Sequence, residues 1–217
     1  MRHKVLLVVT ILIFAGVLTI FGYFAFQKPR DVSTTNVPSQ NPSLSTRTTS
    51  RVTVIDPVRG EKNATITIIE YADYLCTYCA DLEPVIAQTL AAYPKKVRFV
   101  WKDFPNDALH PDASRSAEAA RCAGEQGKYW EFHDLLLGRT DVFGLRPLED
   151  WATLIGIDRT FMQDCLASER YKPQVNELLS EALGLKLTGA PSLFINNKPF
   201  EGRTFEEFKN VIDSIAK

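Results

Sequence analysis

The sequence carries almost no net charge, since 25 Lys and Arg residues stand against 26 Asp and Glu residues. This balance provides no broad basic surface, so nucleic acid is not an expected partner. Histidine is also scarce, with 3 residues in 217, and the chain contains no internal repeat. A zinc site needs four close ligands, and the sequence offers only one closely spaced pair of cysteines, so we expect no metal.

An apolar segment at the N-terminus is the first prominent feature. Residues 5–26 contain no charged side chain and follow Arg2 and Lys4, and as a helix they would extend about 33 Å, enough to cross a bilayer. Because no small-x-small cleavage motif follows, residues 1–30 are predicted to be an uncleaved signal anchor and not a cleaved signal peptide. The basic N-terminal flank favours a chain that lies outside a bacterial cytoplasmic membrane, although two basic residues after the segment weaken this asymmetry.

A polar segment separates this anchor from the remainder of the chain. Residues 31–50 are mostly Ser, Thr, Asn, Gln and Pro, which do not bury enough apolar surface to fold. We expect a flexible linker with a root-mean-square span of roughly 25 Å. The folded domain is then expected to cover residues 51–217.

Hydrophobic periodicity in residues 51–217 predicts a mixed α/β domain. The β-branched segment 64–71 is apolar enough for a central strand buried on both faces, and helical spacing follows it until Pro94. A helical insert of about residues 108–186 then precedes a C-terminal hairpin and a last helix. Residues 51–55 are a short β-branched run. The predicted strands are 64–71, 97–101, 192–195 and 199–200, and the predicted helices are 79–93, 113–126, 129–137, one opening near Pro147, 160–167, 173–183 and one after a cap at Thr204.

The most informative motif is Cys76-Thr77-Tyr78-Cys79, at the junction between a predicted buried strand and a helix. At the start of a helix, unpaired N–H groups and the helix dipole stabilise a thiolate, the reactive species in disulfide exchange. A lowered thiol pKa also stabilises the reduced protein and makes its disulfide a stronger oxidant. Half of a zinc site and a purely structural disulfide are the two alternatives for this spacing.

Three segments resemble the DsbA-like proteins of the thioredoxin superfamily, in particular their membrane-anchored branch. Residues 70–79 (EYADYLCTYC) resemble the active-site segment, residues 120–134 (ARCAGEQGKYWEFHD) the signature of the helical insert, and residues 188–195 (TGAPSLFI) the cis-proline loop and its strand. The resemblance extends from about residue 52 to the C-terminus. It implies a thioredoxin-like fold with an inserted helical subdomain and a redox-active cysteine pair, with no other cofactor.

The resemblance also assigns roles to individual residues. Cys76 would be the exposed sulfur that attacks or is attacked, and Cys79 the more buried partner that resolves the mixed disulfide. Pro191 would be the cis-proline beside the disulfide, with the backbone of Ala190 pairing with an extended substrate segment. These four residues would form the centre of the site.

Glu70, six residues before Cys76, occupies the position of the buried acid that helps to move the proton of the inner cysteine in this superfamily. Burial would raise its pKa and allow it to accept the proton of Cys79, with Lys102 as a counter-charge. The alternative is a solvent-facing carboxylate at the end of a strand. His133, by contrast, is expected on a helix surface or as the cap of a contact.

The two other cysteines, Cys122 and Cys165, lie on predicted helices of the insert. An even cysteine count outside the cytoplasm favours pairing, and two helices side by side can bring the α-carbons within disulfide range. We therefore predict a structural disulfide, which would contribute roughly 4 kcal/mol in the chain-entropy model. Two free buried thiols and a second redox pair are the alternatives.

Together these features predict a membrane-anchored thiol-disulfide oxidoreductase that introduces disulfide bonds into secreted and envelope proteins. The resemblance implies reoxidation by a membrane oxidase of the DsbB or vitamin K epoxide reductase type, and we expect a monomer because no dimerisation domain is evident. Thr77 and Tyr78 replace the Pro and His of the best-known oxidant motif, Cys-Pro-His-Cys, so the direction of electron flow stays open. The alternatives are a disulfide reductase or isomerase, and a tethered peptide-binding chaperone whose C-x-x-C pair is structural.

Overall fold

The computed structural model describes residues 49–140, 144 and 146–215. The predicted anchor, and all but the last two residues of the predicted linker, lie outside this part of the chain. Among the helices that are described, none combines the length and the apolar character that a membrane crossing needs.

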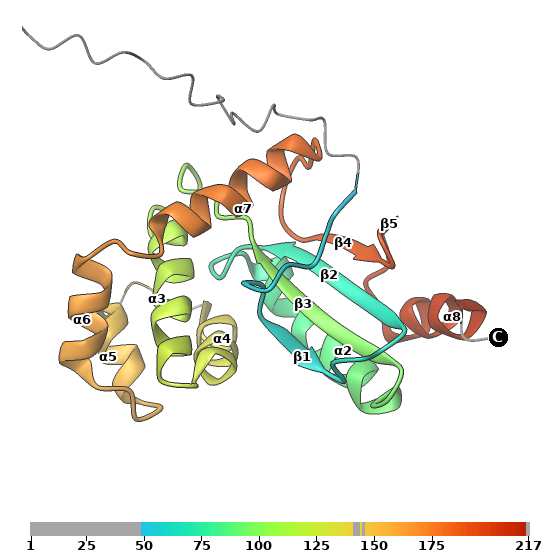
Figure 1. Ribbon diagram of the computed structural model, residues 1–217, viewed down its shortest axis with the longest axis horizontal. Coiled ribbons are helices and arrows are strands. Elements are labelled where there is room, and N and C mark those ends of the chain that lie inside the picture. The colour runs from blue at the N-terminus through green and yellow to red at the C-terminus, as the bar shows by residue number, and fades with distance from the viewer. Residues whose placement is uncertain (1–48, 141–143, 145, 216–217) are drawn as a thin grey trace, which may run out of the picture. The chain divides into compact units, whose positions relative to one another are not determined.

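A five-stranded mixed sheet forms the centre of the domain. Its strands are β1 (Val58–Gly60), β2 (Ile66–Ala72), β3 (Val97–Asp103), β4 (Ser192–Ile195) and β5 (Lys198–Phe200). They lie in the order β1-β3-β2-β4-β5, and only β2 and β3 run parallel (Figure 1). The two central strands contain mainly β-branched and aromatic residues, which favour a pleated strand that is covered on both faces.

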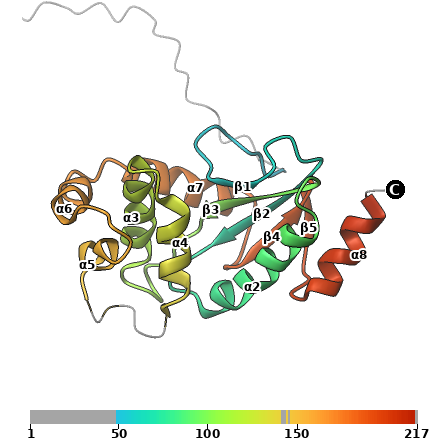
Figure 2. The same cartoon turned by 90° about the horizontal axis from the view of Figure 1, so that it is seen from below.

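Helices cover both faces of this sheet. α2 (Thr77–Ala92) connects β2 to β3, and it packs beside α8 (Phe205–Ile215) on one face (Figure 2). α7 (Lys172–Gly184) lies against the other face, where Ala182 joins a small core with Val100. The domain therefore has three layers, with the sheet in the middle.

Alternation along β2 decides which layer each side chain enters. Ile68 belongs to the large core that also contains Cys79, whereas Ile69 and Tyr71 belong to the small core beneath α7. Glu70 has the same parity as Ile68 and therefore lies on the α2 face of the sheet. The register of this strand thus places one carboxyl group in the layer that holds the inner cysteine.

Five helices fill the interval between β3 and β4, where the helical insert was predicted. They are α3 (Ala113–Glu125), α4 (Tyr129–Leu137), α5 (Leu148–Thr153), α6 (Arg159–Ala167) and α7. Small alanine side chains on α3 allow α4, α6 and α7 to approach it closely. A disulfide joins Cys122 on α3 to Cys165 on α6, with their α-carbons 6.0 Å apart.

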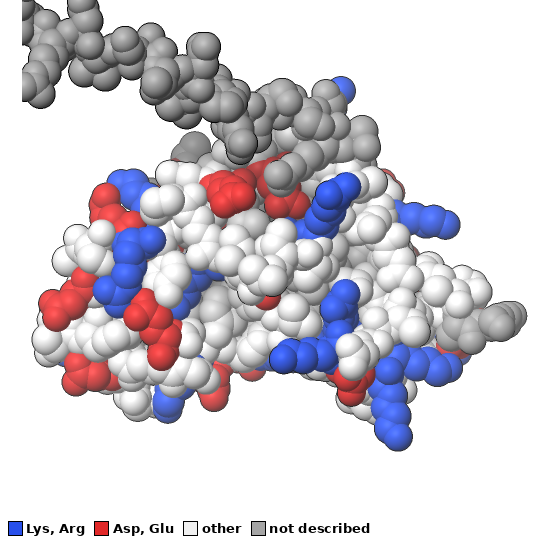
Figure 3. All heavy atoms as spheres, in the orientation of Figure 1, with Lys and Arg blue, Asp and Glu red and all other residues white. Residues whose placement is uncertain are grey.

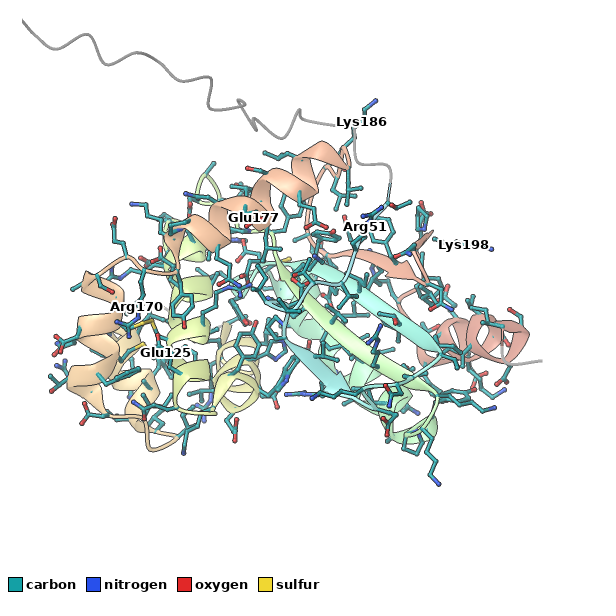
Figure 4. All side chains as sticks on the ribbon, in the orientation of Figure 1. Arg51, Glu125, Arg170, Glu177, Lys186 and Lys198 are labelled. Atoms are coloured by element: carbon teal, nitrogen blue, oxygen red, sulfur yellow. A yellow bond between two sulfur atoms is a disulfide. The ribbon has the colours of Figure 1, made fainter. Side chains whose placement is uncertain are left out.

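The surface of the insert carries mixed charges. Figure 3 shows acidic and basic side chains side by side over these helices. Figure 4 shows Arg170 and Glu125 pointing toward one another, and the Arg170 Nε donates to the Glu125 Oε1 at 2.8 Å. Exposed pairs of this kind contribute only about 0–1 kcal/mol. The stability of the insert therefore rests on its core and its disulfide.

Replacing both Cys122 and Cys165 with Ala should lower the free energy of unfolding by about 4 kcal/mol, because the bond closes a loop with a sequence separation of 43 residues in the unfolded chain. Urea unfolding of the full chain, followed by tryptophan fluorescence, measures this change. Glu125→Gln, which removes the neighbouring ion pair with Arg170 and keeps the disulfide, is the control and should cost less than about 1 kcal/mol. A double variant as stable as the wild type would show that the bond adds no net stability.

The β-branched run 51–55 forms no strand, and its residues 54–55 lie in a turn. The Thr53 N–H donates to the Asp56 Oδ2 at 2.6 Å, and the Asp56 N–H donates to the Thr53 carbonyl at 3.3 Å. Asp56 Oδ2 also lies 3.1 Å from the buried Lys102 Nζ. The turn and the ion pair outweigh the local β propensity, and the edge strand begins later, at Val58.

Candidate active site

Cys76 lies at the junction of β2 and α2, where the sequence placed it. It is the N-cap residue of α2, with extended backbone angles (φ −82°, ψ 117°). A tight turn fixes this position, since the Cys76 N–H donates to the Asp73 carbonyl at 3.1 Å and the Leu75 N–H donates to the Asp73 Oδ1 at 2.8 Å. The Cys76 sulfur therefore lies at the N-terminal end of the helix, beside its unpaired N–H groups.

These surroundings lower the pKa of the Cys76 thiol to about 6. The largest cause is the hydrogen bond from the Cys79 thiol, to which the backbone N–H groups of Cys79 and Tyr78 add. Burial and the carboxylate of Asp73 act in the opposite direction but are outweighed. Cys76 is 8% exposed, so a small part of its surface meets solvent. At neutral pH the accessible sulfur is mostly a thiolate.

Cys79 has the opposite character. It lies one turn into α2 and is fully buried. The hydrogen bond to Cys76 is the largest cause that raises the pKa of its thiol, followed by burial and by the carboxyl group of Glu70. Both cysteines are free thiols in this structure. The pair therefore combines one ready nucleophile with one inner sulfur that keeps its proton.

Glu70 is fully buried on β2, and its solvent-facing alternative is wrong. Neither carboxyl oxygen has a hydrogen-bond partner among the described residues. Burial is the largest cause that raises its pKa, and the charge of Glu83 adds to this, whereas Arg203 lowers it. Burial therefore favours the protonated form of this carboxyl group, which also affects the pKa of the inner cysteine.

Lys102 is not the counter-charge of Glu70, so this prediction is wrong. In the sheet register Lys102 lies opposite Tyr71, while Glu70 lies opposite Trp101. Lys102 therefore points to the α7 face, where its Nζ lies 3.2 Å from Glu181 Oε2 as well as near Asp56. Side chains that differ by one position along a strand lie on opposite faces, so Glu70 remains unpaired.

The Ala190–Pro191 peptide bond is cis, and this loop borders Cys76. The Cys76 Sγ lies 3.6 Å from the carbonyl oxygen of Ala190. Arg203 supports the loop from the other side, since its Nη2 donates to the Pro191 carbonyl at 3.3 Å and its Nη1 to the Gly202 carbonyl at 3.2 Å. Arg203 makes no ion pair within the described part of the chain.

A hollow of ≈ 420 Å³ opens beside this loop. Tyr78, 71% exposed, forms one wall, and Thr77 is also exposed at the start of α2. The sulfur of Cys76 therefore lies next to a surface that an extended peptide can occupy. The lining residues are Tyr78, Asp81, Leu82, Ala190, Pro191 and Arg203.

Sequence reasoning missed Asp73, which ties two active-site loops together. Its Oδ2 accepts from the Asn106 N–H at 3.1 Å and lies 2.8 Å from the His110 Nδ1. The loop after β3 is thereby fastened to the turn that holds Cys76. An acidic residue three positions before Cys76 was the only signal for this role in the sequence.

The helix-surface alternative for His133 is wrong, because its side chain is fully buried. Its ring lies between those of Trp101 and Trp130, with centroid distances of 4.5 Å and 4.9 Å. Its Nε2 lies 3.6 Å from Glu83 Oε1, an acid that the sequence did not single out. Aromatic residues in the first turn of α4 cover the His133 ring, and helical periodicity alone did not predict these contacts.

Glu83, His133 and Asp134 are close enough together to be tested as a metal site. Arg59 decides against it, because its Nη2 lies 2.7 Å from Asp134 Oδ1. A guanidinium group in that place already neutralises the carboxylate and repels a second cation. The cluster therefore fits an acid-base group and does not fit a bound metal ion.

The thioredoxin family model matches residues 53–214, which is most of the chain. Among curated proteins, the chain is 36% identical over 147 residues to the Na(+)/H(+) antiporter NhaA 3 of Salinispora tropica, and the match covers 68% of this chain but 22% of that protein. A second antiporter, NhaA 1 of Mycolicibacterium gilvum, is 30% identical, with 68% and 24% covered. The chain thus spans about a fifth to a quarter of these relatives, whose names describe the whole antiporters.

Solved structures extend the comparison. BdbD from Bacillus subtilis matches with a TM-score of 0.66 at 19% identity, covering 73% of this chain and 91% of that one. A thioredoxin-like oxidoreductase from Silicibacter pomeroyi matches at 0.61 with 26% identity and coverages of 74% and 92%. Wolbachia pipientis α-DsbA1 matches at 0.66 with 22% identity and coverages of 75% and 92%. The chain therefore belongs to the thioredoxin family and has the fold of the DsbA-like thiol-disulfide oxidoreductases.

Proposed function

We propose that this protein is a thiol-disulfide oxidoreductase that introduces disulfide bonds into proteins outside the cytoplasm. The observation that carries the proposal is the contrast within the C-x-x-C pair. Cys76 has a pKa of about 6 at the mouth of the site, and Cys79 is buried with a raised pKa. A stable thiolate at Cys76 favours the reduced protein, so the oxidised protein readily passes its disulfide to a substrate.

The reaction follows from this arrangement. A substrate thiolate attacks the Cys76 sulfur of the oxidised pair, and the bond to Cys79 breaks. Cys79 leaves as a thiolate and takes a proton from Glu70, the acid whose charge raises the pKa of the Cys79 thiol. A second substrate thiolate then attacks the substrate sulfur of the mixed disulfide and displaces Cys76 as a thiolate. The substrate loses two electrons, and the cysteine pair gains them.

The loop of Ala190 and Pro191 is proposed to hold the substrate during this exchange. The Ala190 carbonyl lies at the Cys76 sulfur, where the backbone of an extended segment can pair with it as an added strand. Tyr78 and Thr77 are exposed beside it and are proposed to contact the side chains of the substrate. Such backbone pairing tolerates many sequences, as an enzyme that acts on unfolded chains requires.

Turnover needs an oxidant that returns Cys76 and Cys79 to the disulfide. We assign this role to a membrane oxidase of the DsbB or vitamin K epoxide reductase type. The apolar segment 5–26 supports attachment to a bacterial cytoplasmic membrane, and the linker 31–50 would let a monomeric domain reach such an oxidase. Residues 1–30 serve as the single anchor in this proposal.

One observation favours reduction or isomerisation as a second candidate function. Tyr78 occupies the position next to Cys79 where a histidine would add positive charge near Cys76. Without that charge the Cys76 thiolate depends on hydrogen bonds alone. A weaker stabilisation of the reduced pair would move the redox potential toward that of a reductase.

The redox potential separates these two functions. We expect a potential above the glutathione poise of about −220 to −260 mV, because the low pKa of Cys76 stabilises the dithiol. Equilibration of the purified full chain with glutathione buffers, followed by alkylation and mass measurement of Cys76 and Cys79, gives the value. A potential near that of thioredoxin, about −270 mV, would assign the protein to reduction or isomerisation.

A further inference from the structure

Two fully buried acid-base side chains near the cysteine pair, Glu70 and His133, and the partly buried Glu83 have polar atoms without a partner. These atoms are both oxygens of Glu70, Oε1 of Glu83 and Nε2 of His133, and no described residue makes a hydrogen bond to them. An unpaired buried polar atom costs about 1–3 kcal/mol, so three such groups in one core layer need an explanation. Proton transfer is a use for which a fixed, saturated hydrogen bond would be a disadvantage.

The three groups form a series that begins at the inner cysteine. Glu70 lies on β2 beneath α2, and its charge affects the thiol of Cys79. Glu83 lies four residues after Cys79, so both project from the same face of α2 toward the sheet. The charge of Glu83 raises the pKa of Glu70, so the two carboxyl groups interact electrostatically. His133 follows, with its Nε2 3.6 Å from Glu83 Oε1.

The other ring nitrogen of His133 lies beside a side chain that reaches solvent. Its Nδ1 lies 3.0 Å from Asp134 Oδ1, and the side chain of Asp134 is 53% exposed. Burial would raise the pKa of Asp134, but hydrogen bonds from His133 and Arg59 hold it below its usual value. An ionised Asp134 accepts the Nδ1 proton of a neutral imidazole, and this leaves the Nε2 lone pair directed at Glu83.

Burial and the surrounding charges shift the pKa values of the members of this series. Burial lowers the pKa of His133, and burial raises the pKa of Glu83 to about 7. Arg59 from β1 lowers the pKa of Glu83, and Asp134 from α4 raises it. The aromatic rings of Trp101, Tyr74 and Trp130 enclose the imidazole without adding charge.

We propose that His133 carries protons between the buried Glu70–Glu83 pair and solvent at Asp134. The inference deepens the proposed function and rests on it. When a substrate is bound through Cys76, it covers the mouth of the site, and Cys79 still has to gain or lose a proton. The series provides a second way out, through the side of the domain where Asp134 and Arg59 reach solvent. His133 is thus a positioning residue that acts through Glu83 and Glu70.

Proton and tautomer balance both close over one catalytic cycle. When Cys79 loses its proton, Glu70 and Glu83 pass one proton to His133 Nε2, and the Nδ1 proton leaves through Asp134 to water. When Cys79 later becomes a thiolate again, the Nε2 proton moves inward and Nδ1 takes a proton from water through Asp134. Each cycle contains one transfer in each direction, so the imidazole returns to its first tautomer.

The test is the pH dependence of the step that needs the Cys79 proton. Reduced full chain is mixed with excess glutathione disulfide, and alkylation followed by mass measurement gives the rate at which Cys79 resolves the mixed disulfide on Cys76. We expect His133→Gln, which keeps a polar group but does not titrate, to slow this step by about tenfold near neutral pH. The deficit should shrink in alkaline buffer, where hydroxide can take the proton from Glu83, whose side chain is 15% exposed, without help from His133.

Two further variants keep the result interpretable. Glu131→Gln changes an exposed acid on the same helix and should leave the rate unchanged. Asp134→Asn leaves the core intact and should slow the step in the same pH range as His133→Gln. Wild-type rates in both His133→Gln and Asp134→Asn, or an equal loss at every pH, would overturn the relay while leaving the proposed function standing. A wild type that never resolves the mixed disulfide would overturn both.

Discussion

Replacing Cys76 with Ser should reduce disulfide exchange to the rate of the uncatalysed reaction. The Cys76 sulfur is the one that reaches the surface, whereas Cys79 is fully buried and keeps its proton. A serine hydroxyl neither ionises near neutral pH nor forms a disulfide, so no other group in the site replaces the lost nucleophile. Oxidation of a reduced, unfolded model protein by the full chain, followed by free-thiol titration, measures the effect.

The control for this variant is Glu177→Gln, a change at an exposed acid on α7 (Figure 4). Wild-type Cys76 should also react with iodoacetamide at a rate that rises with pH and reaches half its maximum near the pKa of about 6. Exchange that survives in Cys76→Ser would contradict the assignment. A wild type that binds unfolded peptide but never exchanges disulfides would favour the tethered chaperone.

Replacing Glu70 with Gln should slow the steps that move the Cys79 proton on the order of 100-fold, because a positioned general acid or base typically contributes that much or more. The amide has the shape of the carboxyl group but neither releases nor accepts a proton near neutral pH. Cys76 should still react with alkylating reagents at close to the wild-type rate, because its pKa depends mainly on Cys79 and the backbone. Quenched-flow measurement of mixed-disulfide resolution, beside the alkylation rate of Cys76, separates proton transfer at Cys79 from the reactivity of Cys76.

Glu70→Gln should also change how stability depends on pH. The pKa of Glu70 is raised in the folded protein, so the folded state keeps a proton that the unfolded state loses above its ordinary value of about 4.5. Wild-type stability therefore falls as pH rises from that value toward the raised pKa. Gln does not titrate, so the variant should gain stability relative to the wild type between about pH 5 and about pH 8.

Urea unfolding at the two pH values gives this difference, with Glu177→Gln as the matched control for the loss of one carboxylate. A Glu70 variant whose stability follows the wild-type pH profile would show that Glu70 is ionised in the folded protein. An unchanged rate of mixed-disulfide resolution would show that Cys79 exchanges its proton elsewhere. Either outcome would remove Glu70 from the reaction described above.

The Glu70 and His133 variants should differ in how their defects depend on pH. Loss of Glu70 removes the group next to Cys79, so the defect should persist in alkaline buffer as long as the active site stays closed to hydroxide. Loss of His133 removes only the connection to solvent, so its defect should depend on pH. The comparison of the two profiles therefore locates where a proton leaves the core.

Much of the fold could be predicted because its signals are local. The helix at 129–137 and the strand at 192–195 have the bounds that periodicity gave, and the Asn196-Asn197 turn has both residues at positive φ (47° and 65°). Asn tolerates this region better than most residues, so two neighbouring residues favour the turn of this hairpin. The β-branched run 51–55 forms no strand, because Asp56 makes a long-range ion pair with Lys102 that local propensity does not include.

The sequence by itself determined the reactive pair of this protein and its place at the start of a helix, because a strand, a turn and a helix follow one another within a few residues. Only the tertiary structure decided what surrounds that pair. It buried Glu70 without a partner, turned Lys102 to the opposite face and brought His133 to Glu83, fifty positions earlier in the chain. Periodicity states which face a residue occupies, but the partner on that face comes from another element, and its identity depends on how the layers pack.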